Sequence, residues 1–157
     1  MTQSIIPTTV DRVAQATAHE TNNAIYRDTE MRVHLLAQSE NPRAIQQRLE
    51  ELDREWDIER TLEANAAMAS LVGITLGSMV DKRFFLLPAA VATFLLQHSI
   101  QGWCPPLPLF RRLGIRTSKE IDRERVALKA MRGDFESVNG SQSRSEKADR
   151  ALHASKS

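Results

Sequence analysis

Two stretches without a charged side chain dominate the pattern of this chain. Residues 64–80 and 84–110 contain no Asp, Glu, Lys or Arg, and three charged residues at 81–83 separate them. As a helix, the first stretch would span about 25 Å at roughly 1.5 Å per residue, close to the ~30 Å hydrocarbon core of a bilayer. The prolines that follow Gly102 cannot continue a helix. The pattern therefore predicts a hairpin over 64–103, with helices at about 64–80 and 84–103.

The segments before the hairpin are polar with narrow apolar seams. Residues 1–41 predict a weakly amphipathic helical segment, because their apolar positions recur at a spacing of three to four but with polar interruptions. Residues 42–63 predict a charged amphipathic helix leading into the membrane, with its seam at Ile45, Leu49, Leu52 and Trp56. This helix can run without a break into residues 64–80 or bend near Asn65.

The segments after the hairpin are also polar. Residues 104–135 predict a juxtamembrane segment followed by a charged helix, which a Thr-x-x-Glu capping box at Thr117 and Glu120 would open. Residues 136–157 are rich in Ser, Lys, Arg and Glu and poor in apolar side chains, a composition typical of a disordered tail.

Neither hairpin helix has the polar face that a helix in water needs. The flanking helices have seams too narrow to enclose the hairpin, whereas lipid would solvate it directly because helices satisfy their own backbone hydrogen bonds. The predicted fold is therefore all-α: a two-helix transmembrane hairpin flanked by cytoplasmic amphipathic helices and a disordered C-terminal tail. A soluble helical oligomer that buries residues 64–103 between subunits is the alternative.

Small residues recur every four positions on the first hairpin helix, at Ala69, Gly73 and Gly77. Small side chains let membrane helices approach closely. Their packing partner would be the second helix of the same hairpin, a second copy of the chain, or both. The pattern leads us to expect a homodimer.

Charge is distributed unevenly around the hairpin. The chain of 157 residues has a net charge of +1, but residues 1–63 carry −5 and residues 111–157 carry +5. A balance near zero gives no argument for a nucleic-acid partner. Basic residues flank the hairpin on both sides, whereas its turn holds only Lys82 and Arg83. Both termini are therefore predicted to be cytoplasmic, with Arg111 and Arg112 at the lipid head groups.

Cys104 is the sole cysteine, so the chain forms no intramolecular disulfide and offers no framework of paired cysteines for a metal. With His98 six residues earlier, Cys104 is either a reactive thiol for persulfide or redox exchange or an apolar packing residue in a tight turn; packing is the preferred reading. No catalytic residue, metal ligand or cofactor is predicted.

Two short elements carry a resemblance: Gly102-Trp103-Cys104-Pro105 and Arg112-Leu113-Gly114-Ile115. With the preceding hairpin, over roughly residues 55–135, the chain resembles the YgaP-like transmembrane domain family of small bacterial inner-membrane proteins. The resemblance implies a two-helix membrane domain in the inner membrane that self-associates. Some relatives carry a rhodanese domain, but its activity does not transfer, because here the single cysteine lies beside prolines.

Together these features predict a non-enzymatic inner-membrane protein. Its hairpin would anchor it in the lipid bilayer and self-associate, and its cytoplasmic helices would engage a protein partner. A membrane-bound thiol or persulfide carrier using Cys104 is the alternative function.

Overall fold

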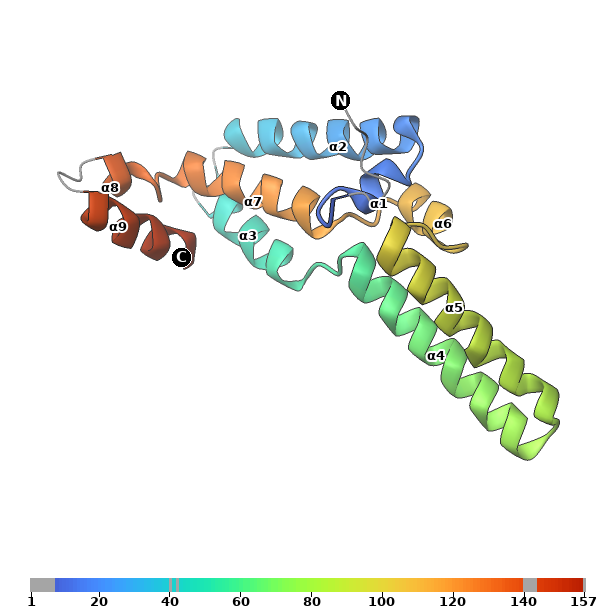
Figure 1. The fold of residues 1–157 in the computed structure, drawn as a ribbon. Helices are drawn as coiled ribbons and strands as arrows, with labels where there is room; N and C mark the ends of the chain where they lie inside the picture. Colours follow the sequence, from blue (N-terminus) through green and yellow to red (C-terminus); the bar gives the residue numbers. More distant parts are fainter. Residues whose placement is uncertain (1–7, 40, 42, 140–143, 157) are drawn as a thin grey trace, which may run out of the picture. The chain divides into compact units, whose positions relative to one another are not determined.

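The computed structural model describes residues 8–39, 41, 43–139 and 144–156, and within these ranges the chain is helical and forms no β-strand (Figure 1). The all-α prediction is confirmed. In chain order the elements are α1 (Arg12–Gln15), α2 (His19–Ala37), α3 (Ala44–Arg54), α4 (Ile58–Met79), the 3-10 helix η1 (Lys82–Phe85), α5 (Leu86–Gln101), α6 (Leu107–Arg112), α7 (Ser118–Arg132), α8 (Glu136–Asn139) and α9 (Arg144–Lys156).

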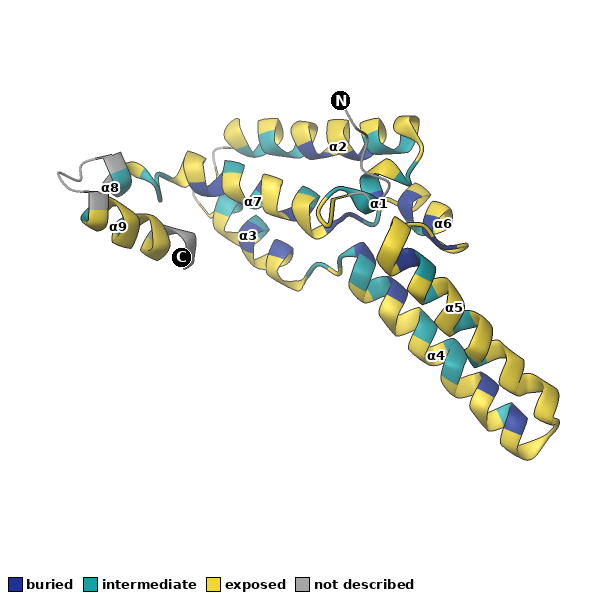
Figure 2. Ribbon diagram, in the orientation of Figure 1, coloured by how far each residue is buried: buried dark blue, intermediate teal, exposed yellow. Residues whose placement is uncertain are grey.

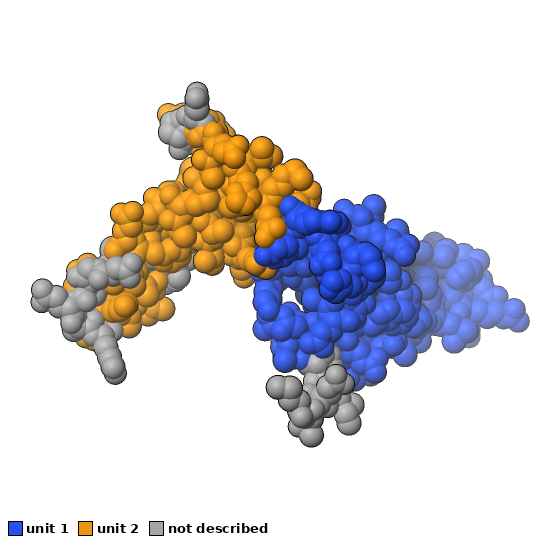
Figure 3. Space-filling view, turned by 90° about the horizontal axis from the view of Figure 1, so that it is seen from above, with its two compact units in different colours: residues 1–27, 56–120 blue, residues 28–55, 121–157 orange. Residues whose placement is uncertain are grey.

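The helices form two compact units, coloured separately in Figure 3. The first, called here the hairpin unit, contains residues 1–27 and 56–120; the second, the charged unit, contains residues 28–55 and 121–157. Helices α2 and α7 contribute residues to both.

Helices α4 and α5 run antiparallel as a long hairpin within the hairpin unit (Figure 1). Asp81 stabilises the turn, because its Oδ1 accepts a hydrogen bond of 2.8 Å from the Arg83 amide. Helix α5 ends where the sequence predicted, at Gly102, whose φ of 74° lies in the left-handed region that favours glycine.

Two glycines bring the hairpin helices together. Gly73 and Gly77 are buried on α4. A Cβ atom at Gly73 would lie 2.6 Å from Cδ of Pro88, and one at Gly77 would lie 3.0 Å from the Phe85 ring. Of the packing partners left open above, the second half of the same hairpin therefore occupies this face.

The end of the hairpin away from its turn is closed by the N-terminal residues. Val13 of α1 packs in an apolar cluster with Ile58, Leu62, Cys104 and Leu107. The backbone of Arg12 approaches Gly102 so closely that any side chain there would collide with it. This end of the hairpin has a protein core, unlike the rest of its length.

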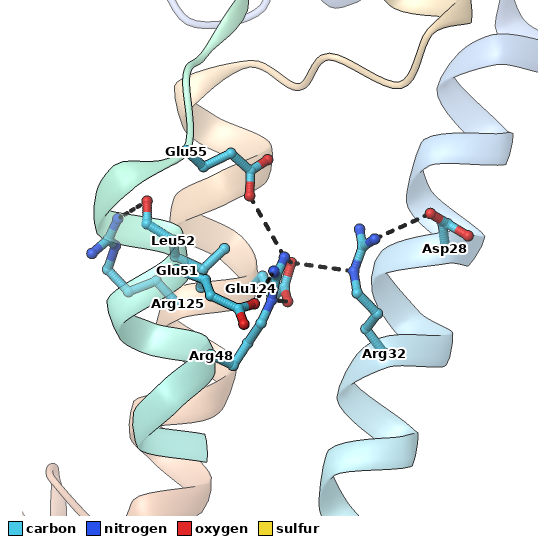
Figure 4. Close-up of polar contacts among 8 residues, drawn as sticks. All are labelled: Asp28, Arg32, Arg48, Glu51, Leu52, Glu55, Glu124 and Arg125. Carbon is cyan, nitrogen blue, oxygen red and sulfur yellow. Dashed lines mark hydrogen bonds and ion pairs between the residues drawn. The ribbon is translucent and has the colours of Figure 1, made fainter. Parts of the chain in front are cut away.

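The charged unit has its own core of Leu49, Leu52, Ile121 and Leu128. Beside this core, the carboxylate of Glu124 is fully buried and lies 2.8 Å from Nε of Arg48 and 3.8 Å from Nε of Arg32 (Figure 4). The hydrogen bond to Glu124 raises the pKa of Arg48. A buried carboxylate needs such paired cations to offset its desolvation, so these pairs hold together the parts of α2, α3 and α7 that belong to this unit.

The continuous helix allowed by the sequence between residues 42 and 80 is absent. Helix α3 ends at Arg54, Glu55 is extended, and α4 starts at Ile58. Asp57 caps α4, since its Oδ1 accepts a hydrogen bond of 2.8 Å from the Arg60 amide, and the Ile58 amide donates to the Arg116 carbonyl at 2.8 Å. These bonds favour a break at 55–57 over the bend near Asn65.

The C-terminal residues also differ from the prediction. Helices α8 and α9 lie within the segment expected to be disordered, although residues 140–143 and 157 fall outside the described residues. The low apolar content of α9 argued against a buried core, but its Ala, Lys, Arg and Glu residues are good helix formers. Glu146 and Arg150 add an ion pair at a spacing of four.

Candidate functional site

Most of the hairpin is exposed (Figure 2), and many of its exposed side chains are large and apolar. Leu71 in the middle of α4 and Leu96 on α5 are 63% and 62% exposed. The other large apolar side chains exposed along the hairpin are Met68, Val72, Ile74, Met79, Val80, Phe84, Phe85, Leu86, Leu87, Phe94 and Ile100. Within the described ranges, Lys82–Gln101 is the one helical segment long and apolar enough to cross a bilayer; α4 does not meet that criterion.

Cys104 lies at the closed end of this hairpin and is 4% exposed. It follows the last residue of α5 by three positions and packs among Val13, Ile58, Leu62 and Leu107. The neighbouring residues Trp103 and Pro105 are both exposed. The Gly102–Pro105 element therefore turns a buried glycine and a buried thiol inward and the other two side chains outward.

A buried histidine lies beside this thiol. His98 is 3% exposed, and its Nε2 lies 2.9 Å from Oε2 of Glu59, so Nε2 carries the hydrogen and donates to the carboxylate. In a neutral imidazole Nδ1 is then the acceptor. Nδ1 is buried and has no hydrogen-bond partner in the part of the chain that the structure describes, and Cys104 neighbours the ring.

Glu59 joins the histidine to the N-terminal segment. Its Oε1 lies 2.7 Å from Nη2 of Arg12, which also donates through Nη1 to the Thr9 carbonyl at 2.7 Å. The hydrogen bond from His98 lowers the pKa of Glu59, with the positive charge of Arg12 adding to this effect against the opposing effect of burial. Glu59 is therefore an anion that holds the imidazole in one orientation.

An apolar cavity of about 290 Å³ opens beside Cys104, between α4, α5 and α6. Ala69 from the small-residue series lines it, together with Phe94 and Phe110; Asn65 supplies a polar side chain. The thiol is thus shielded from water but lines an apolar space. The volume of this space is near the low end of the ~300–1,000 Å³ range of small-molecule pockets.

Arg111 is not at a lipid surface, and its predicted head-group role is wrong. It is 1% exposed. Its Nη1 and Nη2 each lie 2.7 Å from a carboxylate oxygen of Glu120, and it also donates to the Ile115 carbonyl and to Asn22 Oδ1, both at 2.9 Å. These four hydrogen bonds offset the cost of burying the guanidinium, although its Nε has no hydrogen-bond partner among the described residues. Arg112, by contrast, is exposed, as its predicted role requires.

Glu120 performs a second task in this cluster. Its Oε2 accepts from the Thr117 amide at 2.7 Å, while Oγ1 of Thr117 accepts from the Glu120 amide at 3.3 Å. The predicted capping box is confirmed. The sequence therefore located Glu120 and Thr117 but not their connection to Arg111.

Sequence reasoning also missed Glu59 and Arg12, which lie 39 and 86 positions before His98. The available signal was weak: Glu59 is an acidic residue near the start of the first hairpin helix, at the same end of the hairpin as His98. Among the described residues no group of three or more His, Cys, Asp or Glu side chains is placed to hold a metal ion.

A scan against protein-family models and searches of curated proteins and of solved structures found no match to this chain.

Proposed function

We propose that this chain is a non-enzymatic membrane protein, anchored through the α4–α5 hairpin, that self-associates and presents its remaining helices to a cytoplasmic partner. The observation that carries this proposal is the exposure of large apolar side chains along the hairpin, represented by Leu71 and Leu96. Such a continuous apolar surface marks contact with a membrane or a protein.

The chain's own folding favours lipid as the solvent of this surface. The apolar cluster around Val13 covers only one end of the hairpin, and the exposed residues extend from there to the turn. Within the hairpin, Thr75, Ser78 and Thr93 each donate to the carbonyl four residues earlier, at 2.8–2.9 Å. These hydroxyls are therefore satisfied locally and suit a helix in hydrocarbon.

We further propose that the membrane is the bacterial inner membrane and that both termini are cytoplasmic. The resemblance of Gly102–Pro105 and Arg112–Ile115 to the YgaP-like transmembrane domain supports this location, and the basic residues flanking the hairpin support the orientation.

The test is extraction of cell membranes with alkaline carbonate, comparing two leucines of nearly equal exposure. Leu71 is 63% exposed on the hairpin, and Leu35 is 61% exposed on α2. An arginine near the middle of a membrane helix costs about 2.5–3.5 kcal/mol on insertion scales. We expect the native chain and Leu35→Arg to stay in the membrane pellet and Leu71→Arg to be partly released.

Release of the native chain by carbonate would instead support the soluble oligomer. Equal release of the two arginine variants would contradict the proposal that the hairpin surface contacts lipid.

A second candidate function has a specific observation in its favour. The buried, oriented His98 beside Cys104 is the arrangement that activates a thiol, because the imidazole can accept the thiol proton and Glu59 stabilises the resulting cation. This supports the membrane-bound thiol carrier. The test is whether a thiol reagent labels Cys104 in the folded protein at neutral pH. A residue that only packs in the core is not expected to be labelled.

A further inference from the structure

We propose that the cavity beside Cys104 binds an apolar electrophile with an activated double bond, such as an α,β-unsaturated carbonyl compound, and that Cys104 adds to it. This inference rests on the thiol function proposed for Cys104, and it changes the nature of the substrate. A carrier serving a soluble enzyme would need contact with water, whereas Cys104 is 4% exposed and lines an apolar space.

The lining of the cavity suits a flat apolar molecule that carries a carbonyl group. Phe94 and Phe110 offer aromatic surface to a flat apolar molecule, and Ala69 leaves room between the helices. Asn65 donates through Nδ2 to the Thr61 carbonyl at 2.8 Å, and its amide group carries a second hydrogen that can bond a ligand carbonyl. The hairpin surface around the cavity is apolar, so the ligand would arrive from the bilayer.

The polar residues behind Cys104 supply the proton transfer. When the imidazole of His98 is neutral, Nδ1 is the acceptor, because Nε2 donates to Glu59 at 2.9 Å. In the addition, the Cys104 proton passes to Nδ1 while the sulfur electron pair forms a bond to the β-carbon. The double-bond electrons move toward the carbonyl, and the resulting enolate takes a proton back from the imidazolium. The net reaction adds S–H across the double bond and needs no oxidant or reductant.

Paired maleimides test this proposal, because maleimide is itself an activated double bond and Cys104 is the sole cysteine. The purified full-length protein in detergent is labelled with N-phenylmaleimide or with a sulfonated maleimide of similar size. Each rate is divided by the rate for the same protein in denaturant. We expect the normalised rate for the apolar reagent to exceed that for the charged reagent at least tenfold.

Two alanines on the same helix provide a matched pair. Ala69→Phe fills the cavity, whereas Ala67 is exposed and lies outside the cavity lining, so Ala67→Phe is the control. We expect Ala69→Phe to slow N-phenylmaleimide at least tenfold and Ala67→Phe to leave its rate unchanged. Circular dichroism and gel filtration establish that each variant is folded.

The histidine is tested by substitution at neutral pH. We expect His98→Gln to slow both reagents near pH 7, because the Cys104 proton then has no imidazole to accept it. The proposal is overturned by labelling in denaturant alone, by equal effects of the two phenylalanines, or by faster normalised labelling with the charged reagent. The last result would favour a carrier for soluble thiols, and carbonate extraction tests the membrane proposal separately.

Discussion

At the scale of single residues, the buried charges are the most informative positions. Arg111 is fully enclosed, and its charge is balanced by Glu120, which also caps α7. In the charged unit, Glu124 lies between Arg48 and Arg32 and so connects α7 with α3 and α2. In the hairpin unit, the contact with a distant segment is made by Arg111 itself, which donates to Asn22.

Removing Glu120 should show how far the folded state depends on the pairing of Arg111 with Glu120. Breaking a buried ion pair by deleting one partner costs about 3–5 kcal/mol, because the remaining charge is left buried and unpaired. We expect Glu120→Ala to lower the free energy of unfolding by about 3 kcal/mol, measured by denaturant unfolding in detergent. Arg112→Ala, at an exposed neighbour, is the control and should change it by less than about 0.5 kcal/mol. Equal effects of the two substitutions would contradict the structural role of the pair.

The same residue predicts a pH dependence. Burial raises the pKa of Glu120, but the hydrogen bonds from Arg111 and Thr117 outweigh it, so the net pKa lies below the ordinary value of 4.5. Because its pKa is lowered in the folded state, the ionised carboxylate stabilises the protein above pH 4.5. This stabilisation is lost as the pH falls through the pKa of the folded state. Unfolding midpoints between pH 7 and pH 3 should therefore fall less steeply for Glu120→Gln than for the native chain. Parallel curves would show that this carboxylate does not contribute.

At the scale of the elements, the features that could be predicted from the sequence were those with a local signal. Uncharged runs defined the hairpin, Gly102 marked the end of α5, and Thr117 with Glu120 marked the start of α7. The break at 55–57 depends partly on a hydrogen bond from Ile58 to Arg116, and Arg111 depends on Asn22 and Glu120. Pattern and spacing carry no information about such distant partners, which is also why Glu59 was missed beside His98.

The hairpin offers a direct test of element packing. At Gly73, an added methyl group would lie 2.6 Å from Cδ of Pro88. Overpacking costs about 1–3 kcal/mol, more than the ~1 kcal/mol that alanine gains over glycine in a helix. We therefore expect Gly73→Ala to lower the thermal midpoint in detergent, while Thr75→Ala, on the exposed side of α4, does not. A higher midpoint for Gly73→Ala would show that the helices can separate without cost.

At the scale of the whole molecule, the glycine face constrains self-association. Since Gly73 and Gly77 contact residues of their own hairpin, the proposed dimer would use another surface. If that surface lies on the hairpin, exposed side chains of α4 and α5, such as Leu71 and Leu96, would be shared between lipid and the second copy. The proposed self-association and membrane insertion would then depend on the same apolar residues.

The orientation proposed for the chain predicts which positions an impermeant reagent reaches. In a Cys104→Ser background, single cysteines are introduced at three exposed positions, as Thr9→Cys, Lys82→Cys and Ser145→Cys. If both termini are cytoplasmic, a membrane-impermeant maleimide added to intact spheroplasts labels the cysteine at the turn, and the other two react only after lysis. Basic residues on both flanks favour this arrangement because they resist translocation. Labelling of either terminal cysteine in intact spheroplasts would contradict the cytoplasmic placement of both termini, and the flanking charges would then require another explanation.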